Sequence, residues 1–356
     1  MNKTPEGAEG PRIKHYLDLA IKYQASDIHL VAGQPPVYRV QGALMTVDLP
    51  SIDAEYLQEV INEMFNQSQR ETFSKTHELD FAYSCVKGYC FRVNVHQERG
   101  NVAATIRIMP SSLTSLELLG LPPSIGELAL KRSGLILIIG RAGSGKTTTM
   151  THMVEHINQN CRLKIITIED PIEYMHTSKK SLITQREVGE DTASFTAGLK
   201  YALRQDPDVV VVGEMRDLDS ISMALTTAET GHLVLGTLHA PDAIEAINRI
   251  IDVYPGDKQN QIRVQMAENM LAVIGQHLLP KKDASGRVLA SELIVTTMAI
   301  RNMIRRNALA EIRSQMETGR EGMYTLEQCL SSLVKRDIVA PDVAQSHAKF
   351  PSLLEF

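Results

Sequence analysis

The sequence predicts an α/β protein: a parallel sheet covered by helices on both faces, preceded by a smaller α+β domain. From residue 135 onward, wholly apolar runs of strand length alternate with helical patterns, and this alternation is typical of parallel sheets. The runs have no polar face, as expected for strands buried on both sides. Before residue 110 the pattern differs, because amphipathic helices accompany short alternating strands. That pattern predicts a small antiparallel sheet in a compact domain of its own.

The smaller domain is predicted to occupy residues 13–109. Helical spacing marks residues 13–23 and 54–65, and strand patterns mark five further segments: 26–30, 37–40, 80–83, 89–96 and 102–108. Residues 1–12 are rich in Pro, Gly and Glu, which predicts a disordered tail. The composition of residues 110–123 predicts a linker, so the larger domain is expected over residues 124–356. After Pro280 the pattern turns mostly helical, at residues 300–306, 308–317 and 326–336.

The larger domain begins with a strand, a glycine loop and a helix that together predict a phosphate-binding loop. The apolar run 135–139 precedes GRAGSGKT at residues 140–147, which fits the pattern G-x-x-x-x-G-K-[ST]. Glycines let backbone N–H groups converge on phosphate oxygens, and the following helix directs the positive end of its dipole at the anion. Lys146 is expected to reach the β- and γ-phosphates, and Thr147 to bind Mg²⁺. The predicted phosphate-binding residues are Gly143, Ser144, Gly145, Lys146, Thr147 and Thr148.

Carboxylates follow two further apolar strands, at the ends where parallel α/β sheets bind ligands. The strand 165–168 runs into an acidic segment that contains Glu173, and the four valines 209–212 run into Glu214. A carboxylate at this edge can hold Mg²⁺ or polarise an attacking water. The alternative for each group is a solvated acidic loop.

Basic side chains supply further candidates. His232 and His239 bracket the apolar strand 233–238, and either could donate to a γ-phosphate or pass that signal to a neighbour. Packed or solvated histidines are the alternative. In the smaller domain, Arg92 and Arg107 lie in predicted strands. A solvated strand face would explain both, and so would an arginine delivered across a subunit boundary to a transferring phosphate.

Composition limits the class of protein. The 356 residues are typical of two domains, and 37 Lys+Arg against 42 Asp+Glu argue against a general nucleic-acid coat. The four cysteines form no C-x-x-C pair, so neither a zinc site nor a disulfide framework is suggested, and free thiols fit a reducing cytoplasm. The N-terminus is polar, unlike a signal peptide, and no apolar run reaches 18 residues. Any membrane association is therefore expected to go through a partner.

Four segments resemble the motifs of the ATPases of type II secretion and type IV pili. Residues 140–147 correspond to Walker A, TIEDPIEY at 167–174 to the aspartate box, RQDPDVVVVGEMRD at 204–217 to Walker B, and TGHLVLGTLHAPDA at 230–243 to the histidine box. AIRNMIR at 299–305 resembles a motif of the pilus retraction branch, the PilT-like proteins. Extension and secretion motors often carry a tetracysteine zinc motif, and its absence favours the same branch.

The resemblance implies a RecA-like P-loop NTPase core, a PAS-like N-terminal domain and a homohexameric ring that hydrolyses ATP with Mg²⁺. It implies Glu173 as the general base and Glu214 as the Walker B carboxylate. It also aligns Arg92 and Arg107 with arginines of the family's N-terminal domain. ATP is expected between the two domains of one chain, with the neighbour's N-terminal domain packed against that site. Residues 141–142 read Arg-Ala where the family usually has Pro-Thr; because these positions shape the backbone, turnover is expected to survive.

The expected function is a motor that powers type IV pilus retraction through an inner-membrane platform protein, at the cytoplasmic face of the membrane. An extension or secretion motor of the same superfamily is one alternative. A DNA-translocating ring ATPase belongs to another class, and the net charge of −5, without an aromatic-plus-basic patch, argues against nucleic acid as a partner. A regulatory subunit that binds ATP but turns it over slowly would be non-enzymatic, and the presence of both Glu173 and Glu214 argues against it.

Overall fold

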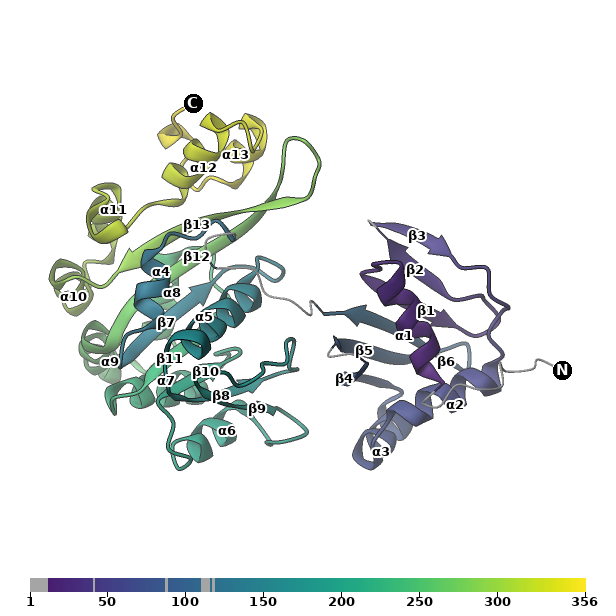
Figure 1. Cartoon of the computed structure of the whole chain (residues 1–356). Coiled ribbons are helices and arrows are strands. Elements are labelled where there is room, and N and C mark those ends of the chain that lie inside the picture. The colour runs from purple at the N-terminus through teal and green to yellow at the C-terminus, as the bar shows by residue number, and fades with distance from the viewer. Residues whose placement is uncertain (1–11, 41, 87–88, 110–115, 117–118) are drawn as a thin grey trace. The chain divides into compact units, whose positions relative to one another are not determined.

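The computed structural model describes residues 12–40, 42–86, 89–109, 116 and 119–356 (Figure 1). Most of the predicted tail and part of the predicted linker lie outside the described residues. The chain divides into two compact units: residues 1–112 with 171–175, and residues 113–170 with 176–356. The segment 171–175 thus groups with the N-terminal unit, although its neighbours on both sides belong to the larger unit.

The N-terminal unit is an antiparallel sheet in the order β3-β2-β1-β6-β5-β4, and its helices share one apolar core with the sheet. Two elements were not predicted. β3 has no buried position, and α3 buries only Gln69 and Phe73, so neither has an apolar period to read. The elements are α1 (Ile13–Lys22), β1 (Asp27–Val31), β2 (Val37–Val40), β3 (Ala43–Thr46), α2 (Ala54–Met64), α3 (Gln67–Thr76), β4 (Glu78–Val86), β5 (Tyr89–Glu98) and β6 (Asn101–Ile108).

The larger unit is built on a seven-stranded sheet in the order β13-β12-β7-β11-β10-β8-β9. All neighbouring pairs are parallel except β12–β13. This confirms the predicted α/β class with a parallel core. The strands are β7 (Gly134–Ile139), β8 (Lys164–Glu169), β9 (Leu182–Glu187), β10 (Val209–Val212), β11 (Leu233–Leu238), β12 (Met270–Pro280) and β13 (Arg287–Val295).

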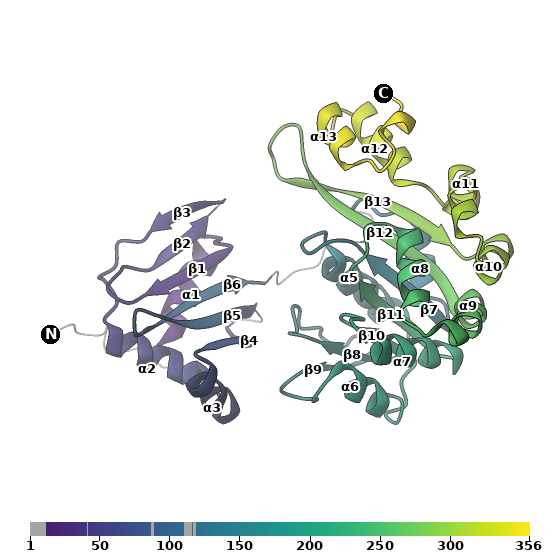
Figure 2. The same cartoon turned by 180° about the vertical axis from the view of Figure 1, so that it is seen from behind.

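Helices cover both faces of this sheet (Figures 1 and 2). In β7, Leu135, Leu137 and Ile139 enter one core, while Ile136 and Ile138 enter a second core on the opposite face. The second core is closed by α4 (Ser124–Ala129) and α5 (Lys146–Asn160), and the first by α6 (Phe195–Ala202), α7 (Leu218–Glu229), α8 (Ala243–Asp252), α9 (Gly256–Asn269) and α10 (Met298–Arg305). A strand with both faces in a core must be apolar throughout, which is why β7 and β10 were readable from sequence.

The expectation that the chain turns mostly helical after Pro280 is wrong for residues 287–295. These form β13, which runs antiparallel to β12 and closes one edge of the sheet. The segments expected to be helical are helical: α10, η2 (Leu309–Glu311) with α11 (Ile312–Glu317), and α12 (Leu326–Lys335). A further helix, α13 (Pro341–His347), was not predicted. Within the described residues, no helix combines the length and the apolar character needed to cross a membrane.

Candidate functional site

The loop between β7 and α5 has a backbone that glycine adopts without strain. Gly140, Gly143 and Gly145 have φ angles of 147°, 75° and 92°. At Gly140 a Cβ atom would lie 2.5 Å from both the Gln276 carbonyl oxygen and the Ser144 Oγ, so a side chain does not fit. Gly145 is the N-cap of α5, so the N–H groups of the first turn have no partner within the helix. These groups and the helix dipole make the loop suited to an anion.

The ammonium of Lys146 lies at this loop. Its Nζ donates to the carbonyl oxygens of Gly140 and Arg141, at 2.9 and 3.0 Å, and lies 3.5 Å from His239 Nδ1. The side chain is 8% exposed, so its charge is held in one place by the surrounding protein. A cation fixed in this way can stabilise negative charge that develops on a bound phosphate.

Glu214 and His239 form a chain of close polar contacts with Lys146. His239 Nε2 lies 3.2 Å from Glu214 Oε1, and Arg216 Nε donates to Glu214 Oε2 at 2.7 Å. Because the lysine ammonium can only donate, it assigns the acceptor role to His239 Nδ1 and the ring proton to Nε2, which then faces the carboxylate. The sheet thus brings a cation, an imidazole and a carboxylate together at the phosphate loop.

Parallel pairing explains why these three residues meet. β7, β11 and β10 are neighbours, and Ile139 pairs with Leu238, so Gly140 and His239 leave the sheet at the same edge. After β10, the turn at Glu214 is fastened on both sides: Gly213 N donates to Ile168 O, and Met215 N donates to Thr237 O. The carboxylate is therefore carried by a turn that two adjacent strands hold in position.

His232 is not brought to this group. It precedes β11, where its carbonyl oxygen accepts from Gly134 N, and its ring Nδ1 lies 3.1 Å from Thr227 O. Six residues of strand separate it from His239, which is about 20 Å at 3.3 Å per residue. The structure therefore places His232 at the opposite edge of the sheet from the phosphate loop, and its catalytic role stays a prediction from sequence alone.

Glu173, Arg92 and Arg107 belong to the N-terminal unit. Arg92 and Arg107 are paired across β5 and β6, and Arg107 Nε donates to Asp27 Oδ1 at 2.9 Å. Burial opposes ionisation of Asp27, but hydrogen bonds from Arg107 and Ser26 outweigh it and lower the pKa of this carboxyl. The Arg107 side chain remains 63% exposed, so this ion pair leaves part of the guanidinium at the surface.

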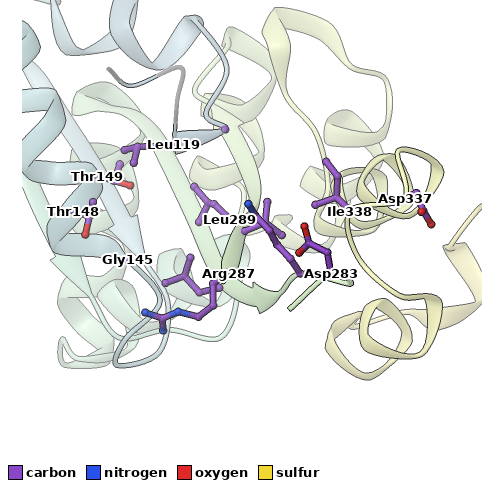
Figure 3. A pocket seen from close by; sticks show the side chains of 13 residues that line it. Leu119, Gly145, Thr148, Thr149, Asp283, Arg287, Leu289, Asp337 and Ile338 are labelled. Atoms are coloured by element: carbon purple, nitrogen blue, oxygen red, sulfur yellow. The ribbon is translucent and has the colours of Figure 1, made fainter. Parts of the chain in front are cut away.

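A cavity of about 510 Å³ lies in the larger unit beside the start of α5 (Figure 3). Gly145, Thr148 and Thr149 line it on the side of the phosphate loop, and the β12–β13 hairpin lines it with Leu278 and Leu289 among others. Charged side chains also line it: Lys281, Asp283, Arg287 and Asp337. The cavity therefore continues the phosphate loop into a partly apolar space.

The sequence did not indicate how β12 supports this region. Gln276, a polar residue within an apolar strand, is fully buried, and its Nε2 donates to Thr149 Oγ1 on α5 at 2.6 Å. One row away, Glu292 on β13 is 6% exposed and accepts from Ala243 N at 2.7 Å. Polar residues in otherwise apolar strands were the available signal, because burial of such groups costs free energy unless they are hydrogen-bonded.

Burial raises the pKa of Glu292 to about 7, with Asp242 and Glu327 adding to the rise while the Ala243 N–H and Arg313 oppose it. In the unfolded chain this carboxyl titrates near 4.5. Between these pH values the folded protein keeps a proton that the unfolded chain loses, so stability falls as pH rises through this window.

We therefore expect Glu292→Gln to gain stability relative to the wild type on going from pH 5 to pH 8. The loss that the wild type suffers is about 3 kcal/mol at most, and the amide cannot titrate. Denaturant unfolding of both proteins at the two pH values measures the difference, in which all other titrating groups cancel. Parallel pH profiles for the two proteins would contradict the assignment.

A glycine loop at a helix start, with a lysine, an imidazole and a carboxylate at the carboxyl edge of a parallel sheet, defines a P-loop nucleotide-binding protein. The model of the family described as "Type II/IV secretion system protein" matches residues 7–348. The chain belongs to this family.

Individual relatives agree with the predicted branch. The chain is 41% identical over 340 residues to the "Type IV pilus retractation ATPase PilT" of Pseudomonas aeruginosa, covering 95% of this chain and 98% of the relative. It is also 41% identical over 327 residues to a "Twitching motility protein" of Neisseria gonorrhoeae, covering 92% and 87%. Among solved structures, "Crystal Structure of the Pilus Retraction Motor PilT and Bound ADP" matches with a TM-score of 0.91 and 42% identity, covering 97% and 99%. The resemblance to PilT-like proteins is thereby confirmed.

Proposed function

We propose that this protein is an ATP-hydrolysing homohexameric motor that powers type IV pilus retraction. The observation that carries the proposal is the chain of contacts from Lys146 through His239 to Glu214 at the phosphate loop. The names of the relatives supply the process: retraction and twitching motility. The motor acts on an inner-membrane platform protein, and it is cytoplasmic, held at the inner face of the membrane by that partner.

The residues of the phosphate loop divide the work of holding ATP. Backbone N–H groups of residues 143–148 surround the phosphates, and Lys146 contacts the β- and γ-phosphates. Thr147 and Glu214 offer the hard oxygen ligands that Mg²⁺ prefers. No group of three or more His, Cys, Asp or Glu side chains that could hold a metal occurs among the described residues, but a nucleotide-bound Mg²⁺ needs only one or two protein ligands besides phosphate and water. The ion, when bound, neutralises charge on the phosphates.

His239 is placed to respond to the terminal phosphate. Its ring lies between the lysine that contacts this phosphate and the carboxylate of Glu214. When the terminal phosphate leaves, both Lys146 and Glu214 lose a partner, and the loop after β11, which carries His239, changes its contacts first. Glu173 is proposed as the general base, and Arg92 and Arg107 of a neighbouring copy as groups that stabilise charge on the transferring phosphate.

The cavity beside α5 is proposed to hold the nucleoside half of ATP. It begins at Thr148, in the first turn of the helix, and its apolar wall includes Leu278, which lies 3.7 Å from the Cβ position of Gly145. An adenine ring placed there would be next to the phosphates and against an apolar surface.

Leu278→Trp should therefore raise KM for ATP about 10-fold with little change in kcat, because the indole fills space that the nucleoside needs. Steady-state kinetics measures both constants. The matched control is Leu182→Trp, a substitution of a leucine on β9 that is 60% exposed and not part of the cavity. An unchanged KM in the Leu278 variant would remove the nucleoside from this cavity.

Helix α10 contains the segment that resembles the retraction motif. Ile300, Met303 and Ile304 are buried in the core of the larger unit, so the apolar face of this helix is used within the fold. Met298 is 69% exposed. The exposed Arg305 and Arg306 pair with Glu268 and Glu311, and the partly exposed Arg301 donates to the Glu268 carbonyl oxygen. This basic side of the helix is proposed to contact a partner. Arg301→Ala should accordingly leave ATP hydrolysis intact while retraction is lost.

The proposed function is tested first in solution, by the size and the ATPase rate of the purified protein with and without ATP. A hexamer that hydrolyses ATP is expected; a protein that stays monomeric at every concentration and yet hydrolyses ATP at full rate contradicts the proposal. Deletion in the source bacterium separates the motors, because loss of retraction leaves piliated cells that do not twitch, whereas loss of extension leaves cells without pili. Stimulation of the ATPase by DNA would favour the translocase alternative.

A further inference from the structure

The loop that joins β11 to α8 begins with His239 and is held by side chains at three of its residues. Arg249 NH1 donates to His239 O at 2.7 Å, Lys349 Nζ lies 2.5 Å from Asp242 Oδ2, and Ala243 N donates to Glu292 Oε1 at 2.7 Å. A loop held this closely has few conformations, so the direction of its first side chain depends on its anchors.

The last anchor, Glu292, lies in the row of the sheet directly before the phosphate loop. On β13 it pairs with Gly275 of β12, which pairs with Ile139 of β7, which pairs with Leu238 of β11. The residues that follow Ile139 and Leu238 are Gly140 and His239. The hydrogen bond from Ala243 N to Glu292 therefore ties the end of the loop to the same level of the sheet as Leu238, the residue just before His239.

The fold makes room for a carboxyl group at this position. A Cβ atom on Gly275 would lie 2.6 Å from Glu292 Cγ and 2.7 Å from its Oε1. Because Gly275 has no side chain, the Glu292 carboxyl group fits at this position. An apolar residue would fill this space without the cost of desolvating a carboxylate. What a carboxyl adds is an acceptor for the Ala243 N–H, which as a first-turn group of α8 has no partner inside the helix.

We propose that Glu292 is a positioning residue for ATP hydrolysis: by holding the first turn of α8, it sets where His239 lies at the phosphate loop. The proposal rests on the proposed function, since it needs His239 to act at the phosphate. Glu292 itself contacts neither the loop glycines nor Lys146 in this structure; its effect passes through residues 239–243.

Two substitutions of similar length separate the acceptor from the charge. Glu292→Gln keeps an oxygen for Ala243 N, whereas Glu292→Met removes it. We expect the Glu292→Met protein to lose about 10-fold or more in kcat with KM for ATP within about 3-fold, and the Glu292→Gln protein to stay within about 3-fold of the wild type in both constants. Ser194→Ala removes the N-cap of α6 and controls for a lost helix cap on an element that contacts neither Glu292 nor His239; it should leave kcat unchanged.

A double-mutant cycle with His239→Ala tests whether Glu292 acts through this histidine. If it does, Glu292→Met has no further effect in the His239→Ala background. Single-turnover rates, with protein in excess of ATP, keep the slow double variant measurable. Lys349→Met loosens the anchor on Asp242 at a half-exposed position, so it serves if the Glu292→Met protein folds poorly. We expect it to lower kcat about 3-fold, again only when His239 is present.

The outcomes separate this inference from the function on which it rests. If His239→Ala alone leaves kcat unchanged, the proposed role of His239 fails. If His239→Ala lowers kcat, and Glu292→Met and Lys349→Met lower it by the same factors in both backgrounds, the proposed function stands and the positioning role is overturned. Equal losses in the Glu292→Gln and Glu292→Met proteins would also overturn it, because the acceptor would then be irrelevant.

Discussion

A Lys146→Ala protein is expected to lose at least about 100-fold in kcat/KM for ATP. The substitution removes the ammonium that the loop carbonyls of Gly140 and Arg141 hold beside His239. This ammonium therefore contacts both the phosphate loop and the histidine, and its loss leaves both without that cation. Release of inorganic phosphate measures turnover, and binding of a fluorescent ADP analogue separates lost affinity from lost chemistry.

Lys200→Ala is the matched control for this experiment. Lys200 is an exposed lysine on α6 in the same unit, so its removal changes net charge equally and should leave turnover within about 2-fold, as expected for a surface substitution away from the site. Near-normal turnover in the Lys146→Ala protein would remove this lysine from its assigned role, whatever the control shows.

The second large effect is expected at Glu214. Glu214→Gln should lower kcat at least about 100-fold while nucleotide binding stays within about 3-fold. The amide keeps the size of the side chain but loses the charge that faces the His239 Nε2 proton and the Arg216 guanidinium. Binding is expected to survive because the loop N–H groups and Lys146 are unchanged, and the amide still offers an oxygen to Mg²⁺.

Asp219→Asn provides the comparison, because it removes an exposed carboxylate from the first turn of α7, five residues further along the chain. Turnover close to that of the wild type is expected there. Should Glu214→Gln weaken nucleotide binding and kcat/KM in parallel, with kcat intact, Glu214 would be a binding group and not part of the hydrolytic machinery.

The sequence predicted those strands whose environment is uniform. β7 and β10 are buried on both faces, so every position is apolar and the run can be read without knowing its neighbours. β12 and β13, whose apolar runs are interrupted by polar residues such as Gln276 and Glu292, were not predicted, and neither was β9, with one buried position in six. β3 and α3 also escaped, because they bury too little for a period to emerge. These elements form because neighbouring parts of the tertiary structure pair with or cover them, which a local sequence pattern does not show.

The candidate site divides in the same way. The glycine loop is a local motif, since its φ angles and its helix start are set within eight residues. Convergence of Glu214 and His239 followed from one general rule, that parallel strands end at a common edge. The same rule places His232 away from them, because a histidine that precedes a strand lies at the opposite end of that strand. The sequence pattern alone, with a histidine at each end of β11, did not distinguish the two.

By itself the sequence determined the family, the phosphate loop and the strand ends from which the carboxylate and the imidazole emerge, because each depends on residues adjacent in the chain. Only the tertiary structure decided which of these groups touch. It also decided that Gly275 makes room for Glu292, and that Glu292 holds the helix that follows His239. The reason is physical: register between strands and the return of a loop to the sheet are set by packing over long separations in sequence, and no local pattern of residue types encodes them.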